Sequence, residues 1–133
     1  MIRVMIVDDQ PTNCQLINQW IKGFATTVQV YDGQKAWQAF IDAHFEKDPF
    51  HLIILDIMMP HMNGIDLLRK IRHWERDNLI ETEPSKVVFV TALDYQSNAL
   101  AGFREGCESY LVKPLNKQIF LDTIENLGFD ISY

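Results

Sequence analysis

Five polar side chains that can bind a metal ion or a phosphoryl group follow the ends of short apolar runs. Asp8 and Asp9 follow the first run, and Asp56 follows the third. Thr91 ends the fourth run, and Lys113 follows the fifth. Taken singly, an Asp or Thr at such a place is usually a helix cap or a turn residue, and a Lys before a proline usually lies on the surface. Their meaning therefore depends on whether the fold brings them together.

Three carboxylates at one edge of a sheet would repel one another, and this repulsion indicates a bound cation. Carboxylate oxygens together with a backbone carbonyl suit a hard divalent ion such as Mg²⁺ or Mn²⁺. A lysine ammonium opposite that ion adds a second positive charge. A metal ion, a lysine and a hydroxyl around one carboxylate can hold a phosphoryl group that is transferred onto that carboxylate. Metal coordination makes such an aspartate a competent nucleophile without a general base.

The spacing of apolar residues predicts the elements that must position these side chains. Short runs rich in β-branched or aromatic residues are typical of buried parallel strands. These runs are Ile2–Val7, Val28–Tyr31, Leu52–Leu55, Val87–Val90 and Tyr110–Val112. Other segments have apolar residues at helical spacing. These segments are Leu16–Phe24, Ala36–Phe45, Ile65–Ile71, Ala99–Phe103 and Ile119–Leu127.

Strands that alternate with helices predict an α/β fold. The crossovers between parallel strands are right-handed, and helices then cover both faces of the sheet, which is a doubly wound architecture. In such sheets the functional residues gather beyond the carboxyl ends of the strands. The five polar side chains stand at those ends, so one edge of the predicted sheet carries the chemistry.

The composition limits the class of protein. The chain has 133 residues, of which 47% are hydrophobic and 23% charged, as is typical of one globular domain. Its formal charge of −6 argues against direct binding of nucleic acid. No apolar run approaches the roughly 20 residues of a membrane span, and no signal-peptide pattern follows the first methionine. We therefore expect a cytoplasmic protein without membrane insertion.

Cysteine and histidine form no metal pattern in the sequence. Cys14 and Cys107 lie in different segments without a nearby Cys or His, so we expect two reduced thiols that help to pack helices. The histidines are scattered over helices and loops and are expected to be exposed or partly packed. They are His44, His51, His61 and His73.

Four short motifs surround the polar side chains at the strand ends. They are Val7-Asp8-Asp9-Gln10, Leu55-Asp56-Ile57-Met58-Met59-Pro60 with Asn63-Gly64, Val90-Thr91-Ala92, and Tyr110-Leu111-Val112-Lys113-Pro114. Together they resemble the receiver domain of two-component response regulators, in particular the chemotaxis regulators, and the resemblance extends from Met1 to about Leu127. It implies a flavodoxin-like five-stranded parallel sheet of order 2-1-3-4-5 with five helices. It also implies a single receiver domain over residues 1–133.

The resemblance implies a role for each acidic residue. Asp56 would be the phosphoacceptor. Asp9, Asp56 and the backbone carbonyl of Met58 would bind Mg²⁺ or Mn²⁺, and Asp8 would act on the metal through water. The chain would be a signalling domain that assists only its own phosphorylation and dephosphorylation, and not an enzyme.

The resemblance also implies roles for residues on the last two strands. Thr91 and Lys113 would contact the phosphoryl oxygens, and the Lys113–Pro114 peptide bond would be cis. Tyr110 would be the aromatic switch residue that responds to Thr91. The output surface would then extend from about Asp94 to Leu127.

The implied partners are proteins. A histidine kinase or a histidine phosphotransfer protein would donate the phosphoryl group in a phosphorelay, and contacts with a downstream protein target or an output domain would change. The sequence leaves open a stand-alone regulator and a receiver from a longer chain. We expect the donor to dock on Gln10, Pro11, Asn13, Leu16 and Leu115.

Three other classes share part of this pattern. An aspartyl phosphatase of the haloacid dehalogenase type needs a second Asp two residues after Asp8, where this chain has Gln10. A flavodoxin-like electron carrier would repel its flavin phosphate with Asp8 and Asp9 after the first strand. A pseudo-receiver that binds proteins without phosphorylation has no need of crowded carboxylates. The pseudo-receiver and, with less support, the phosphatase stay as alternatives.

Overall fold

Five parallel strands form the centre of the computed structural model, which describes residues 1–79, 82–92 and 105–132. The elements are β1 (Ile2–Val7), α1 (Pro11–Ile21), β2 (Ala25–Val30), α2 (Gly33–Phe45), β3 (Leu52–Leu55), α3 (Gly64–Asn78), β4 (Lys86–Thr91), β5 (Ser109–Val112) and α5 (Lys117–Asn126). The strand order β2-β1-β3-β4-β5 confirms the predicted order. These residues contain four helices. The helix predicted at Ala99–Phe103 lies outside the described residues.

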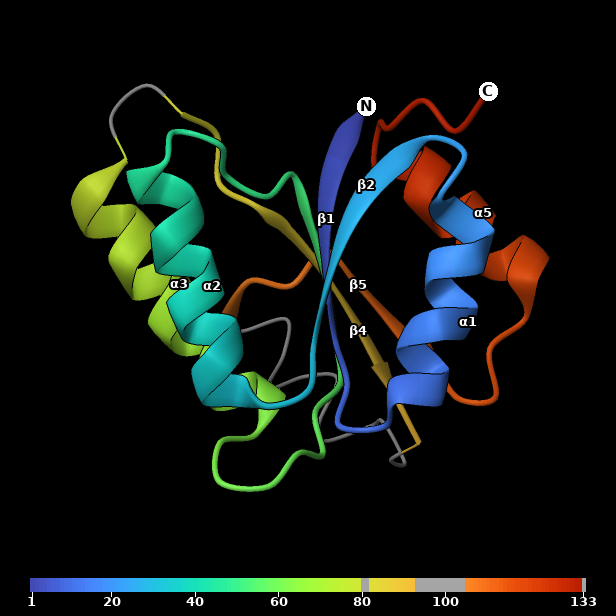
Figure 1. Ribbon diagram of the computed structural model, residues 1–133, viewed down its shortest axis with the longest axis horizontal. Coiled ribbons are helices and arrows are strands. Elements are labelled where there is room, and N and C mark those ends of the chain that lie inside the picture. Colours follow the sequence, from blue (N-terminus) through green and yellow to red (C-terminus); the bar gives the residue numbers. More distant parts are fainter. Residues whose placement is uncertain (80–81, 93–104, 133) are drawn as a thin grey trace.

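Helices cover both faces of the sheet. Figure 1 shows α1 and α5 on one face and α2 and α3 on the other. Alternate residues of β1 point to opposite faces, because successive side chains of a strand alternate. Val4 and Ile6 pack with the residues under α1 and α5, whereas Met5 and Val7 pack with those under α2 and α3. The central strands are therefore buried on both sides, as a doubly wound sheet requires.

Among the strands, the largest difference from the predicted boundaries lies at β2. This strand begins at Ala25, before the predicted start at Val28, and α1 ends at Ile21, so that Phe24 lies in the turn between them. β2 is an edge strand that pairs with β1 alone. Its first half contains Thr26 and Thr27, which an apolar pattern does not mark. Phe24 is buried in the core beside α1, although it is not helical.

Both cysteines are free and buried. Burial raises the pKa of the Cys14 thiol and of the Cys107 thiol to about 11. Each thiol is therefore neutral at physiological pH and packs as a small apolar group. Within the described parts of the chain, no helix is both long enough and apolar enough to cross a membrane.

His44 on α2 is packed between two aromatic rings. Its ring centroid lies 4.8 Å from that of Phe40 and 4.5 Å from that of Trp74. Its Nε2 atom is buried without a hydrogen-bond partner among the described residues. Burial lowers the pKa of His44 below the usual 6.5, and the nearby charge of Glu75 opposes this shift only in part.

The low pKa of His44 predicts a loss of stability in mild acid. The imidazole of His44 binds a proton more tightly in the unfolded chain than in the folded chain. The contribution of neutral His44 to the free energy of unfolding is therefore complete above pH 6.5, and it is lost as the pH falls through the pKa of the folded state. His44→Phe keeps the aromatic packing and removes the proton site. We expect the free energy of unfolding, measured in urea at pH 7 and pH 5, to fall less in His44→Phe than in the wild type.

His73→Gln is the matched control, because His73 is an exposed histidine of α3. It should keep the dependence on pH of the wild type. The same fall in stability for His44→Phe and the wild type would contradict this prediction.

Candidate functional site

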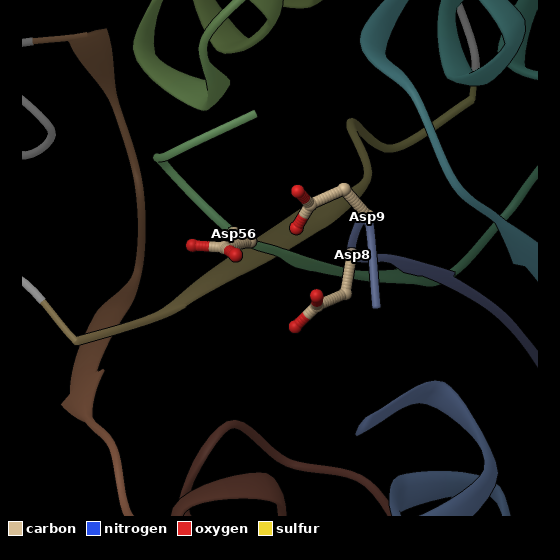
Figure 2. A group of neighbouring side chains, drawn as sticks. All are labelled: Asp8, Asp9 and Asp56. Carbon is tan, nitrogen blue, oxygen red and sulfur yellow. The ribbon is translucent and has the colours of Figure 1, made fainter. Parts of the chain in front are cut away.

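Three carboxylates meet at the carboxyl ends of β1 and β3. Asp8 and Asp9 follow β1, Asp56 follows β3, and these two strands are neighbours in the sheet. The parallel pairing continues beyond the strands, since the N–H of Asp56 donates to the carbonyl of Val7 at 2.9 Å. One carboxylate oxygen of each Asp lies within 4.8 Å of the others. Figure 2 shows the three carboxyl groups side by side. The described ranges contain no second group of this kind.

The three carboxylates differ in what they can still bind. Asp8 is 2% exposed and accepts hydrogen bonds from the backbone N–H of Gln10 at 2.9 Å and from Nδ2 of Asn13 at 3.3 Å. It also accepts from the Lys113 ammonium at 2.8 Å. Asp9 is exposed. Asp9 is therefore accessible to a metal ion, whereas the carboxylate oxygens of Asp8 already accept hydrogen bonds from the protein.

Lys113 brings a positive charge to this cluster from the other end of the chain. Its Nζ lies 2.8 Å from Oδ2 of Asp8 and 3.3 Å from Oδ2 of Asp56. The backbone N–H of Lys113 donates to the carbonyl of Thr91 at 2.8 Å, and the Lys113–Pro114 peptide bond is cis, as predicted. Burial disfavours the ammonium, but the hydrogen bond to Asp8 and the charge of Asp56 outweigh it and raise the pKa of Lys113.

Burial and the charge of Lys113 act in opposite directions on the carboxyl group of Asp56. Asp56 is 5% exposed, and its Oδ1 accepts from the N–H of Met58 at 3.2 Å. Burial raises the pKa of Asp56; the charge of Lys113 opposes this rise, and the charge of Asp8 adds to it. A cation at the cluster would favour the ionised carboxylate, because an adjacent positive charge stabilises it. Burial thus disfavours the ionised form of Asp56, and a divalent ion or another added positive charge would favour it.

Thr91 and Tyr110 lie on neighbouring strands beside the cluster. Thr91 ends β4 and is fully buried. Tyr110 pairs with Phe89 in the β4–β5 register, and the two ring centroids are 6.0 Å apart. Tyr110 is partly buried against the core under α2 and α3. The switch of Tyr110 stays a prediction, and residues 94–104 of the predicted output surface lie outside the described residues.

Gly64 shapes the site in a way that the sequence did not reveal. It begins α3 and donates its N–H to the carbonyl of Ile57 at 2.9 Å. A Cβ atom at this position would lie 2.3 Å from the backbone oxygen of Asp56. In the sequence, Asn63-Gly64 stood out only as part of a motif. In the structure Asn63 caps α3, by accepting from the N–H of Asp66 at 2.9 Å, and Gly64 lets α3 begin directly against the backbone of Asp56.

A pocket of about 510 Å³ opens beside Lys113. It is lined by Gln10, Asn13, Leu16, Ile17, Ala92, Lys113, Pro114 and Leu115. Four of the five residues predicted to dock the phosphoryl donor line it, and Pro11 does not. Asn13 also contacts Asp8, so a substitution of Asn13 would disturb the carboxylate cluster as well as a docking surface.

Comparisons with known proteins identify relatives over nearly the whole chain. The sequence profile of the response regulator receiver domain matches residues 4–125. The uncharacterized transcriptional regulatory protein YclJ of Bacillus subtilis is 30% identical over 117 residues, which are 86% of this chain and 45% of that protein. The chemotaxis protein CheY of Pseudomonas aeruginosa is 30% identical over 128 residues, which are 95% of each chain.

The fold is also that of solved structures. The CheX–CheY–BeF3–Mg²⁺ complex from Borrelia burgdorferi contains a chain that superposes with a TM-score of 0.83 at 21% identity, over 97% of this chain and 90% of that one. The chain thus spans under half of the length of a transcriptional regulator such as YclJ and nearly all of a chemotaxis protein such as CheY.

Proposed function

The chain belongs to the response regulator receiver family of two-component systems, and from this premise we propose that it is a phosphorylatable receiver. Asp56 accepts a phosphoryl group from a phosphohistidine and holds it as an acyl phosphate. One observation carries the proposal: Asp8, Asp9 and Asp56 gather within 4.8 Å of one another, with the Lys113 ammonium 3.3 Å from Asp56. We propose one receiver domain over residues 1–133.

The donor set fits a hard divalent cation. Carboxylate oxygens of Asp9 and Asp56 and the backbone carbonyl of Met58 are the ligands proposed for Mg²⁺ or Mn²⁺, and Asp8 acts through water. When bound, the ion supplies charge neutralisation at the phosphoryl oxygens. The family is a signalling family, and the proposed chemistry is the protein's own phosphorylation rather than turnover of a substrate.

The proposed transfer needs few groups of the protein. An oxygen of the ionised Asp56 carboxylate attacks the phosphorus, and a new O–P bond forms. The P–N bond to the donor imidazole breaks, and its electron pair stays on that nitrogen. Lys113 neutralises charge on the phosphoryl oxygens, and Asp8 holds the Lys113 ammonium in place at 2.8 Å. Thr91, at the end of β4, donates its hydroxyl to the phosphoryl group and biases Tyr110 between two rotamers.

The donor is proposed to dock at the pocket beside Lys113. Its histidine must approach Asp56 in line, and the pocket lies between the start of α1 and the turn after Lys113. A histidine kinase or histidine phosphotransfer protein is the partner of this surface, and a downstream protein or an output domain is the partner of the switched surface. The crowded carboxylates disfavour a pseudo-receiver, since a binding module gains nothing from their repulsion.

Asp9→Ala should weaken Mg²⁺ binding more than Asp8→Ala. Asp9 is exposed and free to coordinate directly, whereas Asp8 is buried and already bound to Lys113, Asn13 and the backbone. We expect isothermal titration calorimetry to show a loss of about 10- to 100-fold in affinity for Asp9→Ala and a smaller loss for Asp8→Ala.

Asp66→Ala, an exposed carboxylate of α3 outside the cluster, is the control and should bind Mg²⁺ as the wild type does. A larger loss in Asp8→Ala than in Asp9→Ala would reverse the roles assigned to the two residues.

A further inference from the structure

A network of charged side chains lies at the end of the sheet opposite the carboxylate cluster. Its centre is Arg72 on α3, whose side chain is 18% exposed. The guanidinium donates at 2.7 Å to the carboxylate of Glu75 and at 2.7 Å to the backbone carbonyl of Ser85. It donates twice to the carbonyl of Gly106, at 3.0 and 2.7 Å, and to both carboxylate oxygens of Glu108, at 3.2 and 3.1 Å. Arg72 therefore joins α3 to the residues just before β4 and β5.

The two acids of this network bind the backbone at the start of β4. Glu75 is 3% exposed and accepts from the N–H of Ser85 at 2.8 Å. Glu108 accepts from the N–H of Val87 at 2.5 Å and donates its own N–H to the carbonyl of Val87 at 2.8 Å. Glu108 thus binds both backbone groups of Val87, and Arg72 holds the carboxylate that does so. These contacts hold Glu108 beside Val87, one residue before the Val88–Ser109 pair of the β4–β5 register.

Among the described residues, β5 is short and has a sheet partner on one side only. It is a four-residue edge strand that pairs with β4 alone. Tyr110 packs under α2 and α3, and Leu111 packs under α1 and α5, so both faces of the strand are apolar. A slip of one residue would exchange the faces of Tyr110 and Leu111, which are both apolar, and the apolar pattern therefore discriminates weakly between registers. The slip would move Lys113 by about 3.3 Å along the strand, out of hydrogen-bond reach of Asp8.

We infer that Arg72, Glu75 and Glu108 specify the register of β5 and thereby position Lys113 beside Asp8 and Asp56. The consequence for phosphorylation rests on the function proposed above for Lys113. Desolvation offsets much of the attraction within a buried ion network, so such a network contributes little net stability, but it can select one packing among several. Arg72 is in this sense a positioning residue for a site at the far end of the sheet.

The test replaces Arg72 and Glu75 by apolar residues, in the double variant Arg72→Met/Glu75→Leu, so that the buried Glu75 is not left without its partner. Arg69→Met is the matched control, because Arg69 lies on the same helix and its ion pairs, with Asp66 and Glu105, lie outside β4 and β5. Three quantities are measured: amide hydrogen exchange of each strand by NMR, Mg²⁺ affinity by calorimetry, and the initial rate of labelling by acetyl phosphate.

In the double variant we expect the amides of Ser109–Val112 to exchange at least about tenfold faster. Labelling should slow by about tenfold or more, since Lys113 is misplaced. Mg²⁺ affinity and the exchange of β1 and β3 should stay within roughly twofold of the wild type, because Arg72 binds neither strand that carries the carboxylates. The Arg69→Met control should match the wild type in all three.

Unchanged exchange of β5 in the double variant would overturn the inference. Equal loss of protection in β1, β3 and β5 would also overturn it, because the network would then support the whole fold. If the wild type and Arg69→Met are not labelled either, the proposed function fails, and the exchange of β5 alone decides whether the network sets its register.

Discussion

Asp56→Asn will show no gain in mass after incubation with acetyl phosphate and Mg²⁺, whereas the wild type will gain the mass of one phosphoryl group. The amide has no anionic oxygen to attack phosphorus. Asp8, the other carboxylate beside Lys113, already accepts hydrogen bonds from Gln10, Asn13 and Lys113. Intact-protein mass spectrometry measures the gain directly. Labelling of the wild type must vanish when Mg²⁺ is chelated.

The same substitution should stabilise the unphosphorylated protein at neutral pH. Burial raises the pKa of Asp56 above its usual 3.8, so the folded state favours the protonated carboxyl. The stability that this group contributes is therefore complete below pH 3.8 and is lost as the pH rises through the folded pKa. The side-chain amide of the Asp56→Asn variant cannot ionise and avoids this loss, so the melting temperature of the variant at pH 7 should exceed that of the wild type.

Asp66→Asn is the control for both measurements, since Asp66 is an exposed residue of α3. It should be labelled as the wild type is and should not gain stability. Labelling of Asp56→Asn equal to that of the wild type would place the phosphoacceptor elsewhere. A lower melting temperature of Asp56→Asn would show that the pair with Lys113 outweighs the cost of burying the carboxylate.

Gly64→Ala will damage the site and the fold together. The added Cβ would lie 2.3 Å from the backbone oxygen of Asp56 and 3.0 Å from its carbonyl carbon, and backbone atoms cannot yield as a flexible side chain does. We expect a loss of about 3 kcal/mol in the free energy of unfolding, since overpacking that forces backbone shifts has this size. For a chain of this length, that loss lowers the melting temperature by about 10 °C.

The displaced Asp56 should also be labelled more slowly, by about 10- to 100-fold, at a temperature where the variant is folded. Gly128→Ala is the control, because Gly128 has a positive φ of 100° but a Cβ there would meet only Nζ of Lys86, at 3.7 Å. It should lose about 1–2 kcal/mol through backbone strain and keep the labelling rate of the wild type. A Gly64→Ala protein with normal labelling would mean that α3 moves away without shifting Asp56.

Local patterns in the sequence determined the order of the elements and which residues stand at the strand ends. The strands β1 and β3 were predicted with their observed bounds, because apolar residues fill every position of β3 and every position of β1 except Arg3, as in strands that are buried on both faces. The start of β2 could not be predicted in this way, since an edge strand tolerates Thr26 and Thr27. The residues of the candidate site were identifiable because Asp8, Asp9 and Asp56 follow buried runs directly.

Only the tertiary structure decided which of those residues contact one another, and at what distance. Lys113 binds Asp8 more closely than Asp56, although 105 positions separate Lys113 from Asp8. Gly64 abuts the backbone of Asp56, and Arg72 reaches Gly106, 34 positions away. Periodicity reports which face of its own element a residue occupies. The distance between two elements depends instead on how their side chains pack against other elements and on the register of the strands. The spacing of residues along the chain does not determine either of these.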